Sequence, residues 1–206
     1  MNKKVTCALV GALTTVAVAP VAFAHFKLLA PAGWIVEDAR GDPQKTAPCG
    51  GTNANPGTPT GAVTAVAGGG RLAIAIDETI FHPGHYRFAL ARTMDALPAD
   101  PEVTMQDTDR GPRSLSAKIE TEPKPPILVD GLWPHTERPT APYAIYLDVP
   151  NVDCKGCVLQ IIQFMANHPG VQEGGFSYHH CAILDIQAAR NRPVDEQWAA
   201  FLGPNP

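Results

Sequence analysis

Short apolar segments separated by glycine and proline run through most of this chain, and they constrain its fold more than any other feature. Several alternate polar and apolar side chains, as strands do when one face lies in a core. Residues 60–67 and 114–119 are the weaker segments. The stronger ones are residues 72–76, 85–91, 142–149, 157–165 and 181–186. Short strands at this spacing predict an all-β fold, a β-sandwich.

Two long stretches without strand signals interrupt this pattern. Residues 32–59 are rich in Gly, Pro, Asn and Thr, and residues 94–112 are rich in Asp, Pro and Glu. Loops this long in a compact domain are usually functional or mobile. Near the end, residues 193–202 predict one short helix, because Pro opens the segment and Gly203 follows it. The length fits a single domain over residues 25–206.

The first 24 residues have the organisation of a cleavable export signal. Lys3 and Lys4 precede an uncharged apolar stretch over residues 5–21, and residues 22–24 (Ala-Phe-Ala) have the pattern of a cleavage site. The apolar stretch contains Gly and Pro and is marginal in length for a membrane span. We therefore predict a signal peptide over residues 1–24. The mature protein is expected to be exported, either periplasmic or secreted, with no membrane span.

The charge balance argues against nucleic acid as a partner. The chain has 16 Lys and Arg against 20 Asp and Glu, a formal net charge of −4. Without Lys3 and Lys4 the balance is 14 minus 20, or −6, and no basic run remains. Proteins that bind nucleic acid usually present a basic surface instead. We take the mature protein to be a monomer.

Export also favours disulfides between the cysteines of the mature chain. Cys49, Cys154, Cys157 and Cys181 are an even number in an oxidising compartment. Of the three possible connectivities, we favour Cys49–Cys181 with Cys154–Cys157, because the Cys-x-x-Cys loop can close on itself. A thioredoxin-like redox centre would need a βαβ setting, and no helix is predicted nearby. A four-thiolate zinc site is disfavoured because Cys49 has no neighbouring cysteine.

Cleavage after Ala24 would make His25 the first residue of the mature chain. An α-amine has a pKa of about 7.7–8.0, so it can lose a proton and bind a metal. The amine nitrogen and ring Nδ1 can then chelate one ion. One more imidazole would complete a three-nitrogen, T-shaped site, which suits copper because copper prefers tetragonal nitrogen ligands. His82 is our first choice, since Pro83 and Gly84 place it on a loop that enters a strand.

Three other histidines are secondary candidates as ligands of this ion. His85 begins a predicted strand and could lie at the surface. His179 and His180 are adjacent, so their rings would face opposite sides of a strand. A further histidine, His135, follows a Trp-Pro pair in a predicted loop and has no visible partner.

Taken together, these motifs resemble those of the lytic polysaccharide monooxygenases, and most closely the fungal cellulose-active branch. There are also similarities to the chitin-binding bacterial branch. The motifs occur in the same order as in that family and span nearly the whole chain. They are the mature N-terminal histidine, the loop His82-Pro83-Gly84, the apolar segment 157–163 followed by His168, and the ending Tyr178-x-x-Cys181.

The resemblance implies an immunoglobulin/fibronectin III-like β-sandwich with one copper ion in a histidine brace. In this brace His25 supplies amine and ring nitrogens, and His82 supplies the second ring. Tyr178 matches the axial position of the fungal enzymes. His168 falls near a histidine that helps to position bound oxygen, and Gln163 falls near a polar residue of the preceding segment. These three residues are therefore expected to take part in catalysis.

The implied activity is oxidative cleavage of a chitin- or cellulose-like polysaccharide with an external electron donor. The resemblance also implies the disulfide between Cys49 and Cys181. The sequence departs from the family at Phe176, where a glutamine is expected, and in the additional His179 and His180. Two alternatives therefore stay open. One is a non-catalytic copper-binding or delivery protein that uses the same brace, and the other is a carbohydrate-binding β-sandwich without metal.

Overall fold

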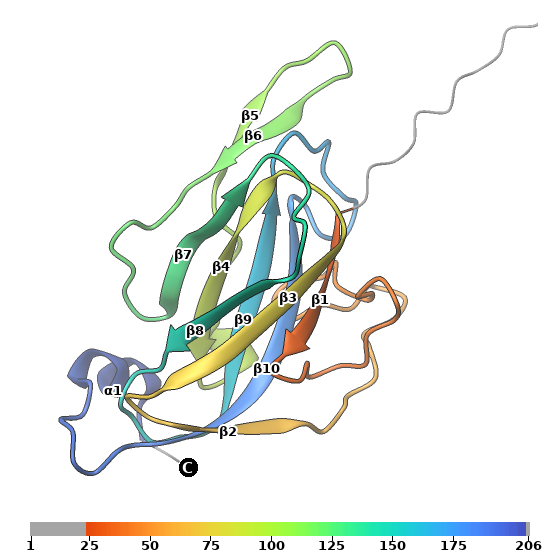
Figure 1. The fold of residues 1–206 in the computed structure, drawn as a ribbon. Coiled ribbons are helices and arrows are strands. Elements are labelled where there is room, and N and C mark those ends of the chain that lie inside the picture. Colours follow the sequence, from red (N-terminus) through yellow and green to blue (C-terminus); the bar gives the residue numbers. More distant parts are fainter. Residues whose placement is uncertain (1–23, 205–206) are drawn as a thin grey trace, which may run out of the picture.

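The computed structural model describes residues 24–204, so nearly all of the predicted signal peptide lies outside the described residues (Figure 1). The described strands are β1 (His25–Ala30), β2 (Val63–Ala67), β3 (Arg71–Ile80), β4 (Gly84–Ala91), β5 (Val103–Gln106), β6 (Arg113–Ala117), β7 (Ile127–His135), β8 (Tyr143–Asp148), β9 (Cys154–Met165) and β10 (Ser177–Gln187). The helices are the 3₁₀ turn η1 (Met94–Ala96) and α1 (Glu196–Leu202). Within residues 24–204, no helix has the length and apolar character needed to cross a membrane.

Two sheets pack face to face and form a β-sandwich, which confirms the predicted all-β fold (Figure 1). The smaller sheet has the strand order β1-β3-β8, and the larger has the order β2-β10-β9-β4-β7. The pairings are antiparallel except for β2, which runs parallel to β10. Strands β5 and β6 form a separate antiparallel pair that projects beyond the end of β7 (Figure 1).

The main core lies between the two sheets. Phe26 of β1, Ile76 of β3, Phe88 of β4 and Ile161 of β9 are fully buried there. Nearly every residue of β4 and β9 is buried. The smaller sheet covers the inner face of the larger sheet, and loops cover its outer face. Segments buried on both faces read as continuous apolar runs, which explains why β9 was visible in the sequence.

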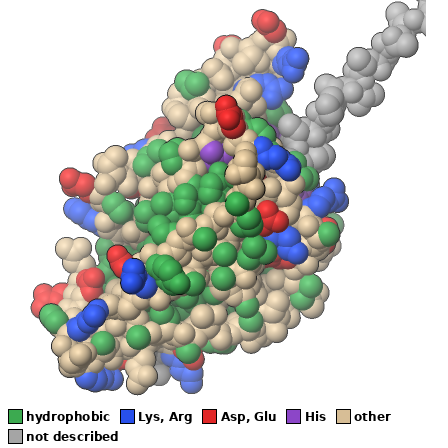
Figure 2. All heavy atoms as spheres, viewed as in Figure 1, with side chains coloured by type: hydrophobic (Ala, Val, Ile, Leu, Met, Phe, Trp, Pro, Cys, Tyr) green, Lys and Arg blue, Asp and Glu red, His purple; other side chains and the backbone are tan. Residues whose placement is uncertain are grey.

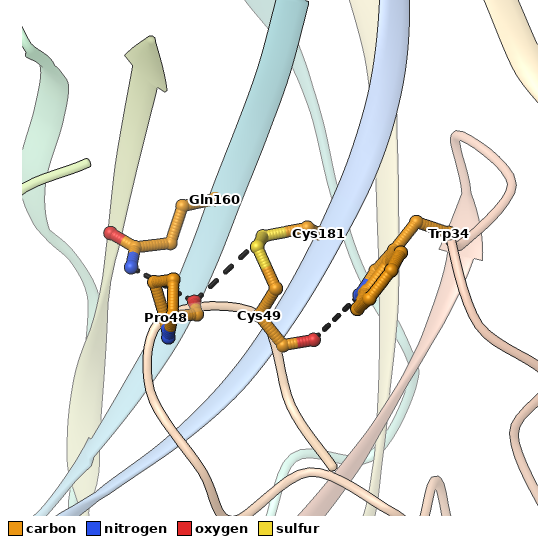
Figure 3. The surroundings of a disulfide bond; sticks show 5 residues. All are labelled: Trp34, Pro48, Cys49, Gln160 and Cys181. Carbon is orange, nitrogen blue, oxygen red and sulfur yellow. Dashed lines mark hydrogen bonds between the residues drawn. A yellow bond between two sulfur atoms is a disulfide. The ribbon is translucent and has the colours of Figure 1, made fainter. Parts of the chain in front are cut away.

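The disulfide between Cys49 and Cys181 attaches the long loop of residues 32–59 to β10 (Figure 3). Two hydrogen bonds hold the segment around Cys49, one from within the loop and one from β9. Trp34 Nε1 donates to the carbonyl of Cys49 at 2.7 Å, and Gln160 Nε2 donates to the carbonyl of Pro48 at 2.9 Å. The second disulfide joins Cys154 and Cys157 at the start of β9. The structure therefore contains both disulfides that the sequence analysis favoured.

Hydrophobic side chains gather over the open side of the sandwich, between the edge strands β7 and β8 (Figure 2). Trp133 of β7 stacks on Tyr143 of β8, with ring centroids 5.0 Å apart and 15° between the ring planes. Tyr86 of β4 packs edge-on against Trp133 at 5.7 Å. These aromatic contacts close this side of the sandwich between β7 and β8.

Three strands were not predicted: β1, β5 and β7. β5 lies inside the stretch 94–112, so the expectation of one continuous loop there was wrong. β7 contains Gly131 and Pro134, two residues that disguise a strand pattern. Proline is tolerated on edge strands, and β7 is the edge of its sheet. His135 is thus the last residue of a strand and not a loop residue.

The C-terminal helix was predicted correctly, but it starts later than expected. Asp195 caps α1, and its side chain accepts a hydrogen bond from the backbone N–H of Trp198. An N-cap carboxylate satisfies a backbone donor that the first helical turn leaves open. Gly203 ends the helix at φ 70° and ψ −176°, a backbone conformation that glycine adopts readily because it has no Cβ.

Candidate metal centre

The two histidines of the predicted brace lie at the same end of the sandwich. His25 is the first residue of β1 and is paired with Ile80, the last residue of β3. His82 follows two residues later, in the turn between β3 and β4. The antiparallel pairing of β1 with β3 is therefore what brings His25 to the His82 loop.

Hydrogen bonds fix the tautomer of each of these two rings. His25 Nε2 lies 2.9 Å from Asp42 Oδ2, and His82 Nδ1 lies 3.2 Å from the carbonyl oxygen of Pro83. Because carboxylate and carbonyl oxygens only accept, the neutral rings hold their lone pairs on His25 Nδ1 and His82 Nε2. Metal-binding histidines usually donate their second ring N–H to such an oxygen. His25 thus carries its lone pair on the nitrogen that would close the chelate.

The surroundings of His82 also favour the neutral form of its imidazole. Burial lowers the pKa of its imidazole, and the nearby His168 acts in the same direction, against the opposing effects of the Pro83 carbonyl and Glu78. The ring centroids of His82 and His168 lie 4.9 Å apart in an edge-on contact. A neutral imidazole is the form that ligates a metal. At neutral pH His82 therefore needs no proton loss to act as a ligand.

Tyr178 lies beside His25, as the resemblance implies for an axial residue. The two ring centroids are 5.2 Å apart, with 62° between the planes. Burial, together with the negative charge of Asp42, raises the pKa of the Tyr178 hydroxyl, so it stays protonated. This hydroxyl is buried and has no hydrogen-bond partner among the described residues. Buried polar atoms are almost always paired, so the hydroxyl indicates that an ion or water belongs there.

Gln163 occupies the position next to Tyr178 in the sheet. It is the direct partner of Tyr178 across β9 and β10, and of Tyr86 across β9 and β4. Its side chain is buried, and within the described chain its Oε1 has no hydrogen-bond partner. The hydroxyl of Tyr86 is unpaired in the same way. One row across the larger sheet thus turns three polar side chains inward, each with an unsatisfied oxygen.

A buried carboxylate that the sequence analysis missed holds this end of the sandwich together. Glu78 of β3 is 4% exposed. Its Oε1 accepts hydrogen bonds from the backbone N–H of His82 at 3.0 Å and from Gln163 Nε2 at 2.5 Å. The signal was present in the sequence, because Leu72, Ile74 and Ile76 alternate inward and the same phase reaches Glu78. The predicted strand ended at residue 76, whereas β3 continues to Ile80 and so includes Glu78.

His135 is the cationic partner of Glu78. Its Nε2 lies 3.2 Å from Glu78 Oε2 and 2.9 Å from the carbonyl oxygen of His82, and its Nδ1 lies 2.8 Å from the carbonyl of Trp133. Burial opposes protonation of this ring, but the hydrogen bonds to Glu78 and the two carbonyls raise its pKa. Both ring nitrogens face acceptors only, which is the arrangement of an imidazolium. His135 and Glu78 thus form a buried ion pair behind the His82 loop.

The structure directs two of the secondary candidates to the outer face of the larger sheet. His179 Nε2 lies 2.8 Å from Asp100 Oδ1, in the loop after η1. His85 packs its ring against Phe164, with ring centroids 5.1 Å apart. The neighbouring residues Tyr86 and Tyr178 point into the sandwich, so strand alternation turns His85 and His179 away from it.

The third secondary candidate, His180, lies inside the sandwich with both ring nitrogens engaged. Its Nε2 donates to the carbonyl of Phe26 at 3.0 Å, and its Nδ1 lies 3.3 Å from Glu37 Oε1. Because Nε2 carries the ring proton, Nδ1 holds a lone pair and the Glu37 carboxyl group must donate. Burial raises the pKa of Glu37 to about 7, and burial lowers the pKa of His180 to about 4. Both shifts favour the neutral pair that the geometry requires.

We predict that the Glu37–His180 pair makes no pH-dependent contribution to the free energy of unfolding between pH 4.5 and 6.5, the ordinary pKa values of the two groups. The raised pKa of Glu37, taken alone, would lower the free energy of unfolding as pH rises from 4.5 to about 7. The lowered pKa of His180, taken alone, would increase it as pH rises from about 4 to 6.5. The two trends cancel where they overlap, because folding only moves one proton from the imidazole to the carboxyl group.

The substitution Glu37→Gln isolates the contribution of the carboxyl group. The amide still donates to His180 but does not titrate. The difference in unfolding free energy, variant minus wild type, should therefore rise between pH 4.5 and about 7 and stay flat outside that range. Urea unfolding at a series of pH values measures this difference. A difference that is constant from pH 4 to 8 would show that Glu37 is not protonated in the folded protein.

Among residues 24–204, no group of three or more His, Cys, Asp or Glu side chains is placed to hold a metal ion. The predicted brace does not require such a group, since its third nitrogen is the amine of His25. In the described chain this nitrogen is still in the peptide bond to Ala24, which is itself fully buried. No protein-family model matches the chain, and no curated protein sequence matches it.

Proposed function

We propose that the mature protein, beginning at His25, is an exported copper-dependent monooxygenase-like protein that cleaves a polysaccharide oxidatively. The observation that carries the proposal is the convergence of His25, His82 and Tyr178 at one end of the sandwich. Their ring tautomers and the unpaired Tyr178 hydroxyl support it.

The residues present fit a copper ion. The amine and Nδ1 of His25 and the Nε2 of His82 would supply three nitrogens, the ligand type that copper prefers. Asp42 and Pro83 hold the two rings through the nitrogens that would not bind the ion. Second partners of this kind orient metal-binding histidines and increase their basicity. Copper held there would supply one-electron redox chemistry and would activate O₂ or H₂O₂ toward a C–H bond beside the glycosidic bond.

The surrounding side chains would limit the access of water to the copper site and would supply a hydrogen-bond donor beside it. Tyr178 stays protonated and, being buried, excludes water from one side of His25. His168 Nδ1 accepts a hydrogen bond from the backbone N–H of Gly170 at 3.0 Å. A neutral His168 therefore carries its proton on Nε2, where it can donate. Such a donor next to His82 agrees with the role in positioning oxygen that the resemblance implies.

The proposal includes removal of residues 1–24 on export. Ala24 is fully buried where it precedes His25. Its removal would release the amine of His25 and, at the same time, expose atoms that Ala24 now covers. Processing would therefore complete the ligand set and open the site in one step.

A copper-binding or delivery protein without a polysaccharide substrate is the second candidate. It is favoured by the burial of His25, His82 and Tyr178, which leaves a large substrate little access in the described chain. Phe176, at the position where the family has a glutamine, favours it too. The two functions share the copper site and differ only in the substrate.

We expect the copper-loaded protein starting at His25 to release oxidised oligosaccharides from chitin or cellulose when an external reductant and H₂O₂ are supplied. Mass spectrometry of the soluble products checks this. The variant His82→Ala should lose about 100-fold or more of the product, because it removes one of the two imidazole ligands. Copper-dependent peroxide turnover with no oxidised oligosaccharide from either polymer would contradict cleavage and support the copper-binding alternative.

A further inference from the structure

A pocket beside the His82 loop has no part in the proposed copper chemistry. It has a volume of about 330 Å³ and lies where the β5–β6 pair and the end of β7 meet β4 and β9. Pockets for small molecules have volumes of roughly 300–1,000 Å³, so this one suits a ligand of about one ring. Its lining includes His85, Leu115, Ile119, His135, Thr136 and Phe164.

The floor of the pocket contains a buried imidazole that lacks a partner. His85 is 7% exposed, and its ring lies against Phe164. Among the described residues, none forms a hydrogen bond with either of its ring nitrogens. Burial lowers the pKa of His85, so the ring is neutral and offers one N–H and one lone pair. A ligand with a hydroxyl group would give one of these nitrogens the hydrogen-bond partner that no described residue supplies.

The wall of the pocket is apolar and held in place. Leu115 and Ile119 are large hydrophobic side chains that are 51% and 41% exposed. Ile119 packs directly on Gly131 of β7, where an added Cβ would lie 2.9 Å from Ile119 Cγ2. Gly131 also has φ +64°, so both its conformation and its missing side chain favour glycine. Exposed apolar side chains that converge on one groove mark a binding surface.

The charges around the pocket select an uncharged ligand. No Asp, Glu, Lys or Arg is found among its lining residues in the described chain. His135 also lines it, but the carboxylate of Glu78 neutralises the charge of that ring. A sugar would need many hydrogen-bond partners, whereas the polar side chains here are two imidazoles and the hydroxyls of Ser116 and Thr136.

We propose that this pocket binds a small uncharged phenol. Its ring would lie between Leu115, Ile119 and Phe164, and its hydroxyl group would form a hydrogen bond with His85. The site requires neither copper nor the free amine of His25, so the proposal stands or fails independently of the proposed function.

The test is a titration of the purified metal-free protein with 4-methylphenol, followed by the backbone amide signals in NMR spectra. We expect saturable shifts in the millimolar range that are confined to the pocket, at Gly84, Leu115 and Thr136 among others. The methyl ether 4-methylanisole keeps the ring but has no hydroxyl proton to donate. It should bind about five- to tenfold more weakly, as expected from the loss of one hydrogen bond.

Two variants and a matched control separate the pocket from the rest of the surface. Leu115→Ser should weaken 4-methylphenol binding about tenfold, because it removes apolar contact area from a half-exposed position. Leu29→Ser changes a leucine of β1 that is 50% exposed, belongs to the smaller sheet and does not line the pocket, and it should leave binding unchanged. His85→Phe keeps a ring without nitrogens, so it should bind the phenol and its ether equally.

Three results would overturn the proposal. They are the absence of saturable shifts in the wild-type protein, equal affinity in Leu115→Ser and Leu29→Ser, and unchanged discrimination between the phenol and its ether in His85→Phe.

Discussion

Replacing Glu78 with alanine is expected to lower the free energy of unfolding by about 3–5 kcal/mol, the usual cost of breaking a buried ion pair by removing one partner. The substitution would leave the His135 imidazolium without its counter-charge. It would also leave the backbone N–H of His82 and the amide of Gln163 without their acceptor. Three donor groups would thus lose the carboxylate that accepts their hydrogen bonds. Chemical denaturation with linear extrapolation measures the loss.

Two control variants separate the effect of the buried charge of Glu78 from that of removing any carboxylate. Glu78→Gln keeps the shape and one acceptor oxygen but removes the charge, so it should cost less, about 1–3 kcal/mol. Glu120→Ala removes an exposed carboxylate that pairs with Lys118 at the surface, and it should change stability by no more than about 0.5 kcal/mol. If Glu78→Ala were as mild as Glu120→Ala, Glu78 would not hold this end of the sandwich together.

Removing the disulfide between Cys49 and Cys181 by a double alanine substitution is expected to destabilise the protein by about 3–5 kcal/mol. The bond joins residues that are 132 positions apart, so it constrains most of the unfolded chain. In the folded protein it also holds the loop of residues 32–59 on β10, and Gln160 of β9 donates a hydrogen bond to the carbonyl of Pro48 in that loop. Loss of the bond should therefore loosen this loop first.

The second disulfide provides the matched control for the first. Cys154 and Cys157 are only 3 positions apart, so the same double substitution there should cost about 2 kcal/mol. Denaturant unfolding of both variants gives the comparison, and amide hydrogen exchange shows which loop opens. If the Cys154 and Cys157 variant were the less stable of the two, the stabilising role assigned to the long-range disulfide would be wrong.

The sequence predicted the elements whose signals are local. The apolar run of β9, the alternation in β4 and β8, and the helix bounded by Pro193 and Gly203 can each be read within one segment. The edge strand β7 could not be read in this way. Its Gly131 and Pro134 are typical of loops, and only its place at the edge of the sheet makes them acceptable in a strand.

The candidate site was predicted in part. The chemistry of an N-terminal histidine pointed to His25, and a turn motif pointed to His82, but their proximity depends on the register between β1 and β3. Register is a long-range property that neither segment reveals alone. The inward position of Glu78 could have been read from the alternation of β3, but its pairing with His135 could not, because the two residues come from distant strands. Asp42, which holds His25, comes from a loop with no strand signal.

The histidine brace is tested most directly by titrating copper(II) into the protein that begins at His25 and into a variant with one additional N-terminal alanine. The two proteins share every side chain of the site and differ only in the position of the free amine. Calorimetry gives the stoichiometry and affinity, and electron paramagnetic resonance reports the ligands.

We predict tight one-to-one binding with an axial, nitrogen-rich spectrum for the protein that begins at His25. The extended variant should lose this spectrum and bind copper about 100-fold or more weakly, because the amine can no longer close the chelate. Equal binding by both proteins, or no binding by either, would contradict the brace and leave a β-sandwich without this copper site.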